Sequence, residues 1–282
     1  MFIRLRLGAT LTHHAFSDLM QAMLRVITAN VNGIRSAAKK GFFEWLATQH
    51  ADVVCLQETR CETHALAPQP FFPAHYHHYY FDAHKKGYSG VSIYSKSEPL
   101  AVHRGLGWAD ADTEGRYIEA DFGDLCIASL YMPSGTSGDV RQTVKFDFMQ
   151  RYESKLKEQC QGSKPAIICG DWNIAHKPID LRNWRANQNE SGFLPEERAW
   201  LDKLVDEMGW VDAFRVVNQE PDQYTWWSQR SKTARSNNVG WRIDYQFIHP
   251  LLQDKVLAAQ ICTKPVFSDH APVMIDYDYN FG

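Results

Sequence analysis

The sequence predicts an α/β protein with two mixed β-sheets packed face to face and flanked by helices, a four-layer α/β sandwich. Short apolar runs typical of buried strands recur from residue 24 to nearly the end of the chain. Segments with helical spacing separate some of these runs in both halves of the sequence. No linker, repeat or low-complexity tract interrupts the pattern. Residues 23–282 are therefore expected to form a single domain with two broadly similar halves.

Composition limits the class of protein. The 282 residues, 44% of them hydrophobic and 13% aromatic, are enough to bury a large core. No apolar run reaches the length of a membrane span. The six cysteines show no C-x-x-C spacing and several lie in strand-like runs, which indicates reduced core residues and a cytoplasmic protein. The net charge of -3 argues against non-specific coating of nucleic acid.

Residues 1–22 stand apart from the rest of the chain. Arg4 and Arg6 precede a weak apolar stretch that His13 and His14 interrupt, which is unlike a secretory signal. An Arg-bearing organellar presequence is one interpretation. We favour a poorly ordered extension ahead of an internal start at Met23, because the first convincing strand begins directly after it.

In the first half, the alternating run at 24–33 predicts a strand and the apolar spacing at 42–46 predicts a helix. Residues 61–75, rich in Pro and His, are expected to form a loop. The next histidines alternate with tyrosines, which favours a strand face over a metal-binding tract. The remaining runs are short and closely spaced, which predicts antiparallel neighbours. Strands are expected at 52–58, 76–80, 88–95, 99–103, 116–122 and 125–131.

In the second half, Asp139 is expected to be the N-cap of a long helix that ends near Gly162. Pro165 opens a buried strand, and the acids after Pro195 indicate the first turn of another helix. Further strands are expected at 241–248, which alternates, and at 256–262 and 271–277.

Polar residues stand at the ends of several predicted strands. Asp171 and Asn173 close the run that begins at Pro165, and in extended chain an i, i+2 pair points to the same side. An Asx turn explains this one pattern equally well. Because the pattern recurs, it predicts one polar site at an edge of the sheets. The other positions are Asn30 with Asn32, Glu58, Tyr131, Asp244, and Asp269 with His270.

The types of side chain indicate the chemistry of this site. Carboxylate and amide oxygens without thiolates suit Mg²⁺ or Mn²⁺ better than zinc. One histidine beside several carboxylates suits metal-assisted hydrolysis of a phosphate ester, in which a proton moves and negative charge is neutralised. Structural alternatives exist for single residues: Glu58 could pair with a nearby arginine, Asp244 with Arg242 or Arg35, and His270 could be a core histidine.

The ordered motifs resemble the exonuclease III / apurinic-apyrimidinic (AP) endonuclease family, within the endonuclease/exonuclease/phosphatase superfamily. The resemblance runs from residue 24 to nearly the end, and the ordered set is specific although each piece is weak. The pieces are Asn-Val-Asn-Gly-Ile-Arg at 30–35, Leu-Gln-Glu-Thr at 56–59, Gly-Tyr-Ser-Gly-Val at 87–91, Leu-Tyr-Met-Pro-Ser at 130–134, Gly-Asp-Trp-Asn-Ile-Ala-His at 170–176, Gly-Phe-Leu-Pro-Glu-Glu-Arg at 192–198, Asn-Val-Gly-Trp-Arg-Ile-Asp-Tyr at 238–245 and Ser-Asp-His-Ala-Pro at 268–272.

The resemblance implies a metal site. Glu58 would hold Mg²⁺, with Mn²⁺ as a substitute, and Asn30 and Asn32 would lie close by. Asp269 would complete the acidic cluster and bind or support the metal. Asn32 stands where some relatives carry Asp, which puts a second metal site in doubt.

The resemblance also implies catalytic roles. Asp171, aligned by Asn173, would orient or deprotonate the attacking water. His270 would contact the scissile phosphate, with Asp244 fixing its tautomer. Tyr131 would stabilise the phosphate charge.

The implied substrate is duplex DNA with abasic sites or blocked 3′ ends. The enzyme would be a monomer that hydrolyses the phosphodiester 5′ to an abasic site, and in a bacterium it would associate with the nucleoid. Trp226, Trp241 and Ile243 would surround the flipped-out, base-less sugar. Contacts with backbone phosphates would come from Arg35, Arg60, Tyr88, Ser134 and Asn187.

Several alternatives stay open. Ala175-His176 resembles the endonuclease-strong branch, with 3′-phosphodiesterase, 3′-phosphatase and 3′→5′ exonuclease as variable further activities. Glu190 stands where an Asn of close relatives contacts phosphate, and a carboxylate there should repel it. One alternative is chiefly a 3′→5′ exodeoxyribonuclease, and another is a different phosphoesterase of the superfamily. A non-catalytic module is disfavoured because Glu58, Asp171 and His270 are all present.

Overall fold

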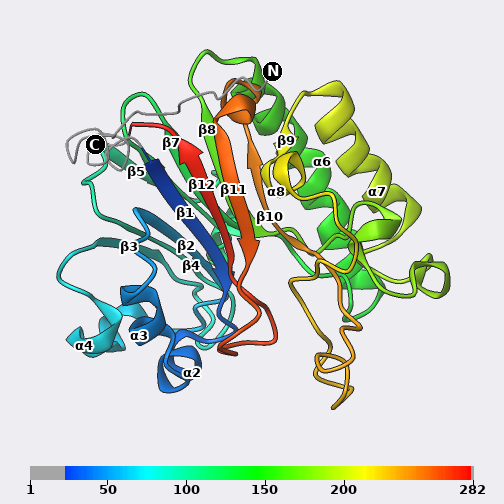
Figure 1. Ribbon diagram of the computed structural model, residues 1–282, viewed down its shortest axis with the longest axis horizontal. Coiled ribbons are helices and arrows are strands. Elements are labelled where there is room, and N and C mark those ends of the chain that lie inside the picture. Colours follow the sequence, from blue (N-terminus) through cyan, green and yellow to red (C-terminus); the bar gives the residue numbers. More distant parts are fainter. Residues whose placement is uncertain (1–22, 281–282) are drawn as a thin grey trace, which may run out of the picture.

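Two six-stranded sheets lie face to face, and helices cover their outer faces (Figure 1). The computed structural model describes residues 23–280. The predicted fold class, two mixed sheets flanked by helices, is confirmed. The expectation of a poorly ordered extension at residues 1–22 lies outside the described residues. Within the described part of the chain, no helix is long and apolar enough to span a membrane.

The first sheet has the strand order β11-β12-β1-β2-β4-β3, and the second has the order β5-β6-β7-β8-β10-β9. The strands of the first sheet are β1 (Met23–Asn30), β2 (Val53–Gln57), β3 (His77–Phe81), β4 (Val91–Ser95), β11 (Val256–Ile261) and β12 (Val273–Asp278). Those of the second are β5 (Ala101–Arg104), β6 (Tyr117–Asp121), β7 (Cys126–Tyr131), β8 (Ala166–Asp171), β9 (Val211–Asp212) and β10 (Asp244–Ile248).

Each sheet contains one parallel pair among antiparallel neighbours. Strand β1 is parallel to β2, and β7 is parallel to β8. Parallel strands need a long crossover, and helices supply it in both sheets. The short strands in the middle of the chain pair antiparallel as predicted, β3 with β4, β5 with β6 and β6 with β7.

Most helices lie on the outer faces of the two sheets, whereas α8 (Ala213–Val217) packs against β11 of the first sheet and β10 of the second, beside the core between them (Figure 1). The other helices are α2 (Ile34–Lys39), α3 (Phe42–Ala47), α4 (Pro68–Phe71), α5 (Ala109–Thr113), α6 (Asp139–Gln161) and α7 (Pro195–Asp202). Short 3-10 helices occur at Thr63–Ala65, Pro178–Asp180, Trp184–Asn187 and Pro250–Lys255, and a π-helical turn at Lys203–Glu207 extends α7.

Apolar side chains fill the spaces between the four layers. In β8, Ile167 faces the other sheet whereas Ile168 packs with Phe148 of α6. Likewise Val53 of β2 faces the second sheet and Val54 packs toward α3. This alternation follows from the two-residue period of a strand. Each fully buried aliphatic side chain contributes about 1.5–3 kcal/mol.

The structure differs from the sequence predictions in several elements. Asp139 is the first residue of α6, and Gly138 with φ 103° is the N-cap. The strand predicted to alternate at 241–248 begins at Asp244 and is buried on both faces, because it lies between a sheet and a helical layer. The loop predicted at 61–75 contains Thr63–Ala65 and α4. All six cysteines are free, as expected.

Candidate active site

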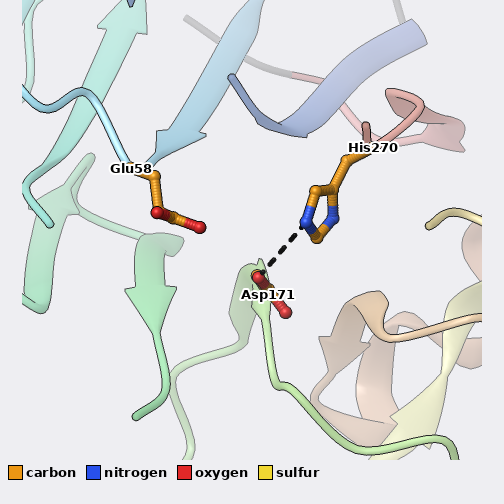
Figure 2. A group of neighbouring side chains, drawn as sticks. All are labelled: Glu58, Asp171 and His270. Carbon is orange, nitrogen blue, oxygen red and sulfur yellow. Dashed lines mark ion pairs between the residues drawn. The ribbon is translucent and has the colours of Figure 1, made fainter. Parts of the chain in front are cut away.

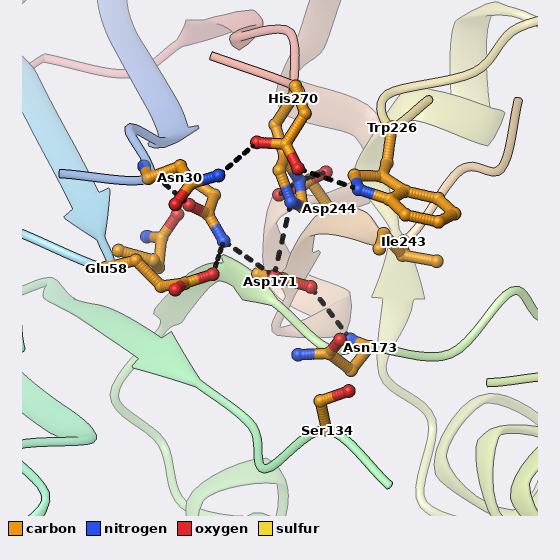
Figure 3. A network of polar contacts seen from close by, with 12 residues as sticks. Asn30, Glu58, Ser134, Asp171, Asn173, Trp226, Ile243, Asp244 and His270 are labelled. Carbon is orange, nitrogen blue, oxygen red and sulfur yellow. Dashed lines mark hydrogen bonds and ion pairs between the residues drawn. The ribbon is translucent and has the colours of Figure 1, made fainter. Parts of the chain in front are cut away.

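The polar strand ends meet in one cleft with a volume of about 330 Å³. Most residues that the sequence singled out line this cleft, and Asn30 and Asp244 are buried beside it (Figure 3). The predicted residues in the lining are Asn32, Glu58, Arg60, Tyr131, Ser134, Asp171, Asn173, Asn187, Trp226, Trp241, Ile243, Asp269 and His270.

The chain turns sharply where three strands end at the cleft. Asn32 after β1, Glu58 after β2 and Asn173 after β8 have φ values of 45°, 51° and 52°. Asparagine tolerates this left-handed region better than most residues, whereas glutamate rarely adopts it. Such conformations cost on the order of 1–3 kcal/mol each and cluster at functional sites. These turns direct polar groups into the cleft.

Two of these strand ends are Asx turns. The backbone N–H of Asn173 donates to Oδ1 of Asp171 at 2.9 Å, and that of Asn32 donates to Oδ1 of Asn30 at 3.0 Å. The expectation of an extended chain at Asp171 and Asn173 is therefore wrong, although both residues line the same cleft as expected. Asp171 and Asn173 therefore form an Asx turn and also belong to the polar site, because the turn fixes the orientation of the Asp171 carboxylate.

Asn30 joins the two acidic strand ends. Its side-chain amide donates to Oε1 of Glu58 and to Oδ2 of Asp171, both at 2.8 Å (Figure 3). Hydrogen bonds to ionised carboxylates are stronger than neutral ones. Asn30 therefore holds a carboxylate of each sheet at a fixed separation.

His270 lies between two carboxylates. Its Nδ1 donates to Oδ2 of Asp244 at 2.9 Å, and its Nε2 lies 3.8 Å from Oδ2 of Asp171 (Figure 2). Burial lowers the pKa of His270, but Asp244 and Asp171 outweigh this and raise it to about 10. Burial and the neighbouring Asp244 raise the pKa of Asp171 to about 7, although His270 opposes the shift. His270 is thus not an ordinary core histidine, because two carboxylates hold it at the cleft.

Asp269 is engaged by three donors. Its Oδ1 accepts from Nδ2 of Asn32 at 2.7 Å and from Oγ of Ser268 at 3.1 Å, and its Oδ2 accepts from Nε1 of Trp226 at 3.2 Å. Burial raises the pKa of Asp269, but His270 and the hydrogen bonds from Asn32 and Trp226 lower it overall. Asp269 therefore stays ionised and fixed beside the imidazole.

The donor set fits a divalent cation. Ligand atoms of Glu58, Asp171 and His270 all lie within 4.8 Å of one another (Figure 2). Two of the three offer hard carboxylate oxygens, which suit Mg²⁺ or Mn²⁺. Arg60 forms an ion pair with the second oxygen of Glu58, as the structural alternative for this acid anticipated. Asp244 pairs with His270 instead of Arg242 or Arg35.

Two predicted phosphate contacts lie outside the cleft. Arg35 is exposed, and its guanidinium donates to the carbonyl of Ala65 at 3.5 Å. The hydroxyl of Tyr88 accepts hydrogen bonds from Arg116 at 3.2 Å and from Arg141 at 3.1 Å. The sequence placed these residues near the motifs, but the fold does not bring them into the cleft lining.

Arg116 positions Tyr131. It donates to the Tyr131 carbonyl at 2.9 Å, and its guanidinium lies 4.9 Å from the ring centre. Burial and the Glu58 carboxylate hold the pKa of Tyr131 well above its usual range. The phenol therefore remains a hydrogen-bond donor at every physiological pH.

An apolar wall stands beside the acidic groups. Trp226 and Trp241 meet edge to face, with ring centres 6.2 Å apart, and Ile243 packs in the same cluster. The backbone bridges Trp226–Trp241 and Trp226–His270 connect this wall directly to the histidine.

The sequence reasoning missed several residues of the cleft. Thr136, Ser191 and Gly192 line it, as does Glu190, which had been noted only as a departure. Ser191 and Gly192 directly precede or begin the Gly-Phe-Leu-Pro-Glu-Glu-Arg motif, which was the available signal. Lys145 was also missed, although it is a charge at an apolar position of α6.

Fold and site together define a class: two packed mixed sheets with an acid, amide and imidazole cluster at one edge form a metal-dependent phosphoesterase. A model of the Endonuclease/Exonuclease/phosphatase family matches residues 27–270. An exodeoxyribonuclease of Bacillus subtilis is 39% identical over 252 residues, which cover 89% of this chain and 98% of the relative. DNA repair nuclease APEX1 of Danio rerio is 37% identical over 92% of this chain and 83% of its own length.

Solved structures agree with these matches. An AP endonuclease from Archaeoglobus fulgidus superposes with a TM-score of 0.82 at 29% identity, covering 90% of this chain and 99% of that one. The chain therefore belongs to the Endonuclease/Exonuclease/phosphatase family and is a metal-dependent phosphodiesterase of the exonuclease III / AP endonuclease type.

Proposed function

We propose that this enzyme hydrolyses the phosphodiester 5′ to abasic sites in duplex DNA, with Mg²⁺ as cofactor and Mn²⁺ as a substitute. One observation carries the proposal: the wall of Trp226, Trp241 and Ile243 stands beside the Asp171–His270 cluster in a single cleft. A base-less sugar can enter a small apolar space that an intact nucleotide cannot enter. Its extrusion from the duplex also costs the least free energy, because no base has to be unstacked. Relatives named for AP endonuclease activity support this choice.

Glu58 is the proposed metal ligand, and Asp171 and His270 are near enough to contribute. The bound cation would neutralise charge on the phosphate oxygens. Asn30 orients Glu58, and Asn32 orients Asp269. Because both oxygens of Asp269 already accept hydrogen bonds, we assign it chiefly to support of the metal site.

Asp171 is the proposed base that orients or deprotonates the attacking water. Its pKa of about 7 lies near the working pH, where general-base catalysis is most effective. Asn30 and the backbone of Asn173 fix its two oxygens, so that little reorganisation is needed at the moment of reaction.

His270 and Tyr131 are the proposed donors to the scissile phosphate. Asp244 holds the ring nitrogen Nδ1, which leaves Nε2 to face the cleft. The raised pKa of His270 keeps the imidazole positively charged near neutral pH. The phenol of Tyr131 adds a neutral donor, and both stabilise negative charge that grows on the phosphate.

Arg60, Ser134 and Asn187 line the cleft and are proposed to contact the phosphates next to the abasic site. Arg35 and Tyr88 lie outside the cleft, so we assign them to the duplex backbone further along. We further propose a monomeric, cytoplasmic enzyme with one catalytic domain at residues 23–282, associated with the nucleoid in a bacterium.

A second candidate is an enzyme that acts chiefly as a 3′→5′ exodeoxyribonuclease. The name of the Bacillus subtilis relative favours it. The same cleft would then accept the terminal nucleotide, and 3′-phosphodiesterase and 3′-phosphatase activity on blocked ends would use the same groups.

The deciding experiment uses a labelled duplex with one reduced abasic site, incubated with Mg²⁺ or with EDTA. An undamaged duplex with a recessed 3′ end is treated in parallel, and product lengths are read on a gel. A single Mg²⁺-dependent cut 5′ to the site, faster than end degradation, supports the main proposal. A ladder from the 3′ end without that cut supports the second. Cleavage of neither contradicts both.

The catalytic assignment has its own test. Asp171→Asn and His270→Ala should each lower the cleavage rate by about 10²–10⁴-fold, the usual contribution of a positioned acid or base. Binding of abasic DNA should persist, because phosphate contacts and the apolar wall supply it. Loss of binding in parallel with cleavage, in a folded variant, would contradict the assignment.

A further inference from the structure

We propose that Lys145 and Glu197 are positioning residues that hold the Asn173 turn and the cleft wall at 190–194 in a fixed relation. The proposal rests on the proposed function, because it concerns the same cleft. Neither side chain lines the cleft itself. Both act through backbone groups that do.

Lys145 of α6 and Glu197 of α7 form an ion pair that is completely buried. Nζ lies 2.5 Å from Oε1, and both side chains have 0% exposure. Removal of two charges from water is expensive, and a well-packed apolar pair often stabilises a core at least as well. Stability alone therefore does not explain why charges occupy these positions. The explanation must lie in contacts that apolar groups cannot make.

The first such contact reaches the catalytic turn. Nζ of Lys145 donates to the carbonyl of Asn173 at 2.8 Å. Asn173 is the left-handed residue whose N–H orients the Asp171 carboxylate, and its side-chain amide donates to the carbonyl of Met132 at 2.9 Å. Lys145 thus fixes the backbone carbonyl of this residue, whose N–H and side-chain NH₂ already have partners, so that the turn has one orientation.

The second contact reaches the opposite wall. Oε2 of Glu197 accepts from the N–H of Gly192 at 2.6 Å and from that of Leu194 at 3.0 Å. Gly192 has φ 95°, and an added Cβ would lie 3.1 Å from the Asn173 carbonyl and 3.2 Å from the Trp241 ring. The segment 190–194 therefore packs closely between the Asn173 turn and the apolar wall, and the hydrogen bonds to Glu197 hold it there.

The position of Lys145 along α6 also supports a positioning role. Lys145 shares one buried face of the helix with the apolar residues Phe148, Met149, Tyr152 and Leu156. A charge at the cleft end of an apolar face is disfavoured unless it is paired and hydrogen-bonded. Gln142, one turn earlier, donates to Oε1 of Glu197 at 3.0 Å and extends the same polar group.

The first test is the double variant Lys145→Met/Glu197→Gln. Both charges disappear, so no buried charge is left unpaired, and methionine matches the shape of the lysine stem. The introduced glutamine can still accept from Gly192 and Leu194, and a flip of the Gln142 amide satisfies its NH₂ group. The variant therefore removes the buried ion pair and the donor to Asn173, while the flipped Gln142 presents its NH₂ group to the Ser191 hydroxyl, which can accept it.

We expect this variant to keep its melting temperature while kcat on abasic DNA falls by about 10²-fold, the effect of a misplacement of about 1 Å, and KM stays constant. Amide hydrogen exchange should accelerate in peptides that cover 172–175 and not in 190–194. A purely structural role would instead lower the melting temperature and leave kcat of the folded fraction unchanged.

A second variant, Lys145→Met/Glu197→Leu, also removes the acceptor for the loop. Here KM should rise in addition to the fall in kcat, and exchange should accelerate at 190–194. The matched control is Arg151→Gln/Asp147→Asn, which removes the surface ion pairs of Arg151 with Asp147 on the same helix α6 and with Asp110 on α5. It should change neither kinetics nor exchange in either segment.

The outcomes separate this proposal from the proposed function. Failure of the wild-type enzyme to cut any DNA contradicts the proposed function, while the exchange measurements still decide the positioning roles. Wild-type kinetics and unchanged exchange at 172–175 in a stable Lys145→Met/Glu197→Gln protein would overturn the proposal.

Discussion

The side-chain amide of Asn30 donates to Oδ2 of Asp171 at 2.8 Å and so connects the last residue of β1 in one sheet to the last residue of β8 in the other. The same amide donates to Glu58. One residue thus sets the distance between the proposed metal ligand and the proposed base. The two sheets meet at the site through this polar contact as well as through their apolar faces.

Asn30→Ala should therefore impair both metal binding and the chemical step. Two buried carboxylates would lose a shared donor, which raises the pKa of Asp171 further. We expect kcat/KM to fall by about 10–100-fold, the usual cost of losing an outer-shell partner, and the Mg²⁺ concentration for half-maximal rate to increase. Initial rates over a Mg²⁺ titration measure both. A rate and a Mg²⁺ dependence equal to those of the wild type would refute the bridging role.

Asp244→Asn should change the pH profile. His270 has a raised pKa of about 10 because Asp244 and Asp171 face it. Without Asp244 the imidazolium loses its main partner, so it should deprotonate at lower pH. The alkaline limb of the kcat profile should move to lower pH, with kcat at pH 7 reduced by about 10²–10⁴-fold. An alkaline limb in the wild-type position would show that His270 does not act as the charged donor.

Asp180 should control acid stability. Burial raises its pKa, but Arg242 and Arg215 outweigh this and lower it to about 2. A lowered pKa stabilises the fold above the unfolded value of about 3.9, and this contribution is lost as pH falls toward about 2. Urea unfolding at pH 7 and at pH 3 should show the difference.

Asp180→Asn gives the matching mutational test. It leaves Arg242, which is buried, with Asp212 as its remaining acid. We expect a loss of about 3–5 kcal/mol in the free energy of unfolding at pH 7. The control Glu153→Gln breaks the exposed pair with Lys203 and should cost only about 0–1 kcal/mol. Equal losses in the two variants would contradict the buried network as the source of stability.

Trp226→Ala should reduce the preference for abasic over undamaged DNA. The apolar wall would lose about 1–3 kcal/mol of discrimination, which corresponds to about 5–150-fold in the ratio of kcat/KM values. Trp226→Phe keeps an aromatic wall but loses the hydrogen bond to Asp269. The Phe variant should retain the preference for abasic DNA and cleave it more slowly. Equal selectivity in the Ala variant and the wild type would show that another part of the cleft recognises the damage.

Glu190→Gln should strengthen DNA binding. Glu190 lines the cleft, where a carboxylate faces the expected phosphate. Removal of one like-charge contact near 4 Å in water is worth about 1 kcal/mol, or about fivefold in Kd. Glu196→Gln, exposed on α7 and absent from the cleft lining, is the control. Titrations at low and high salt should show that the gain shrinks as salt increases.

Local sequence patterns predicted the layers, most strand positions and the polar strand ends. Apolar period and turn residues act over a few positions, and these local signals left an Asx turn at Asp171 open as an alternative, which the structure contains. The family resemblance added expected roles for Glu58 and His270, which the fold brings within reach of each other. Local patterns and the order of motifs are enough to predict a site when its contacts are close in sequence or when its residues belong to the motifs of one family.

Contacts between residues far apart in the sequence depend on the packing of the whole fold. The tertiary structure placed Asn30 against Asp171, turned Asn173 out of extended chain, and left Arg35 and Tyr88 outside the cleft. It also buried Lys145 against Glu197, although the sequence showed only a lysine within an apolar helix face. Such contacts depend on how the two sheets and α6 pack together. The spacing of residues along the chain does not predict that packing.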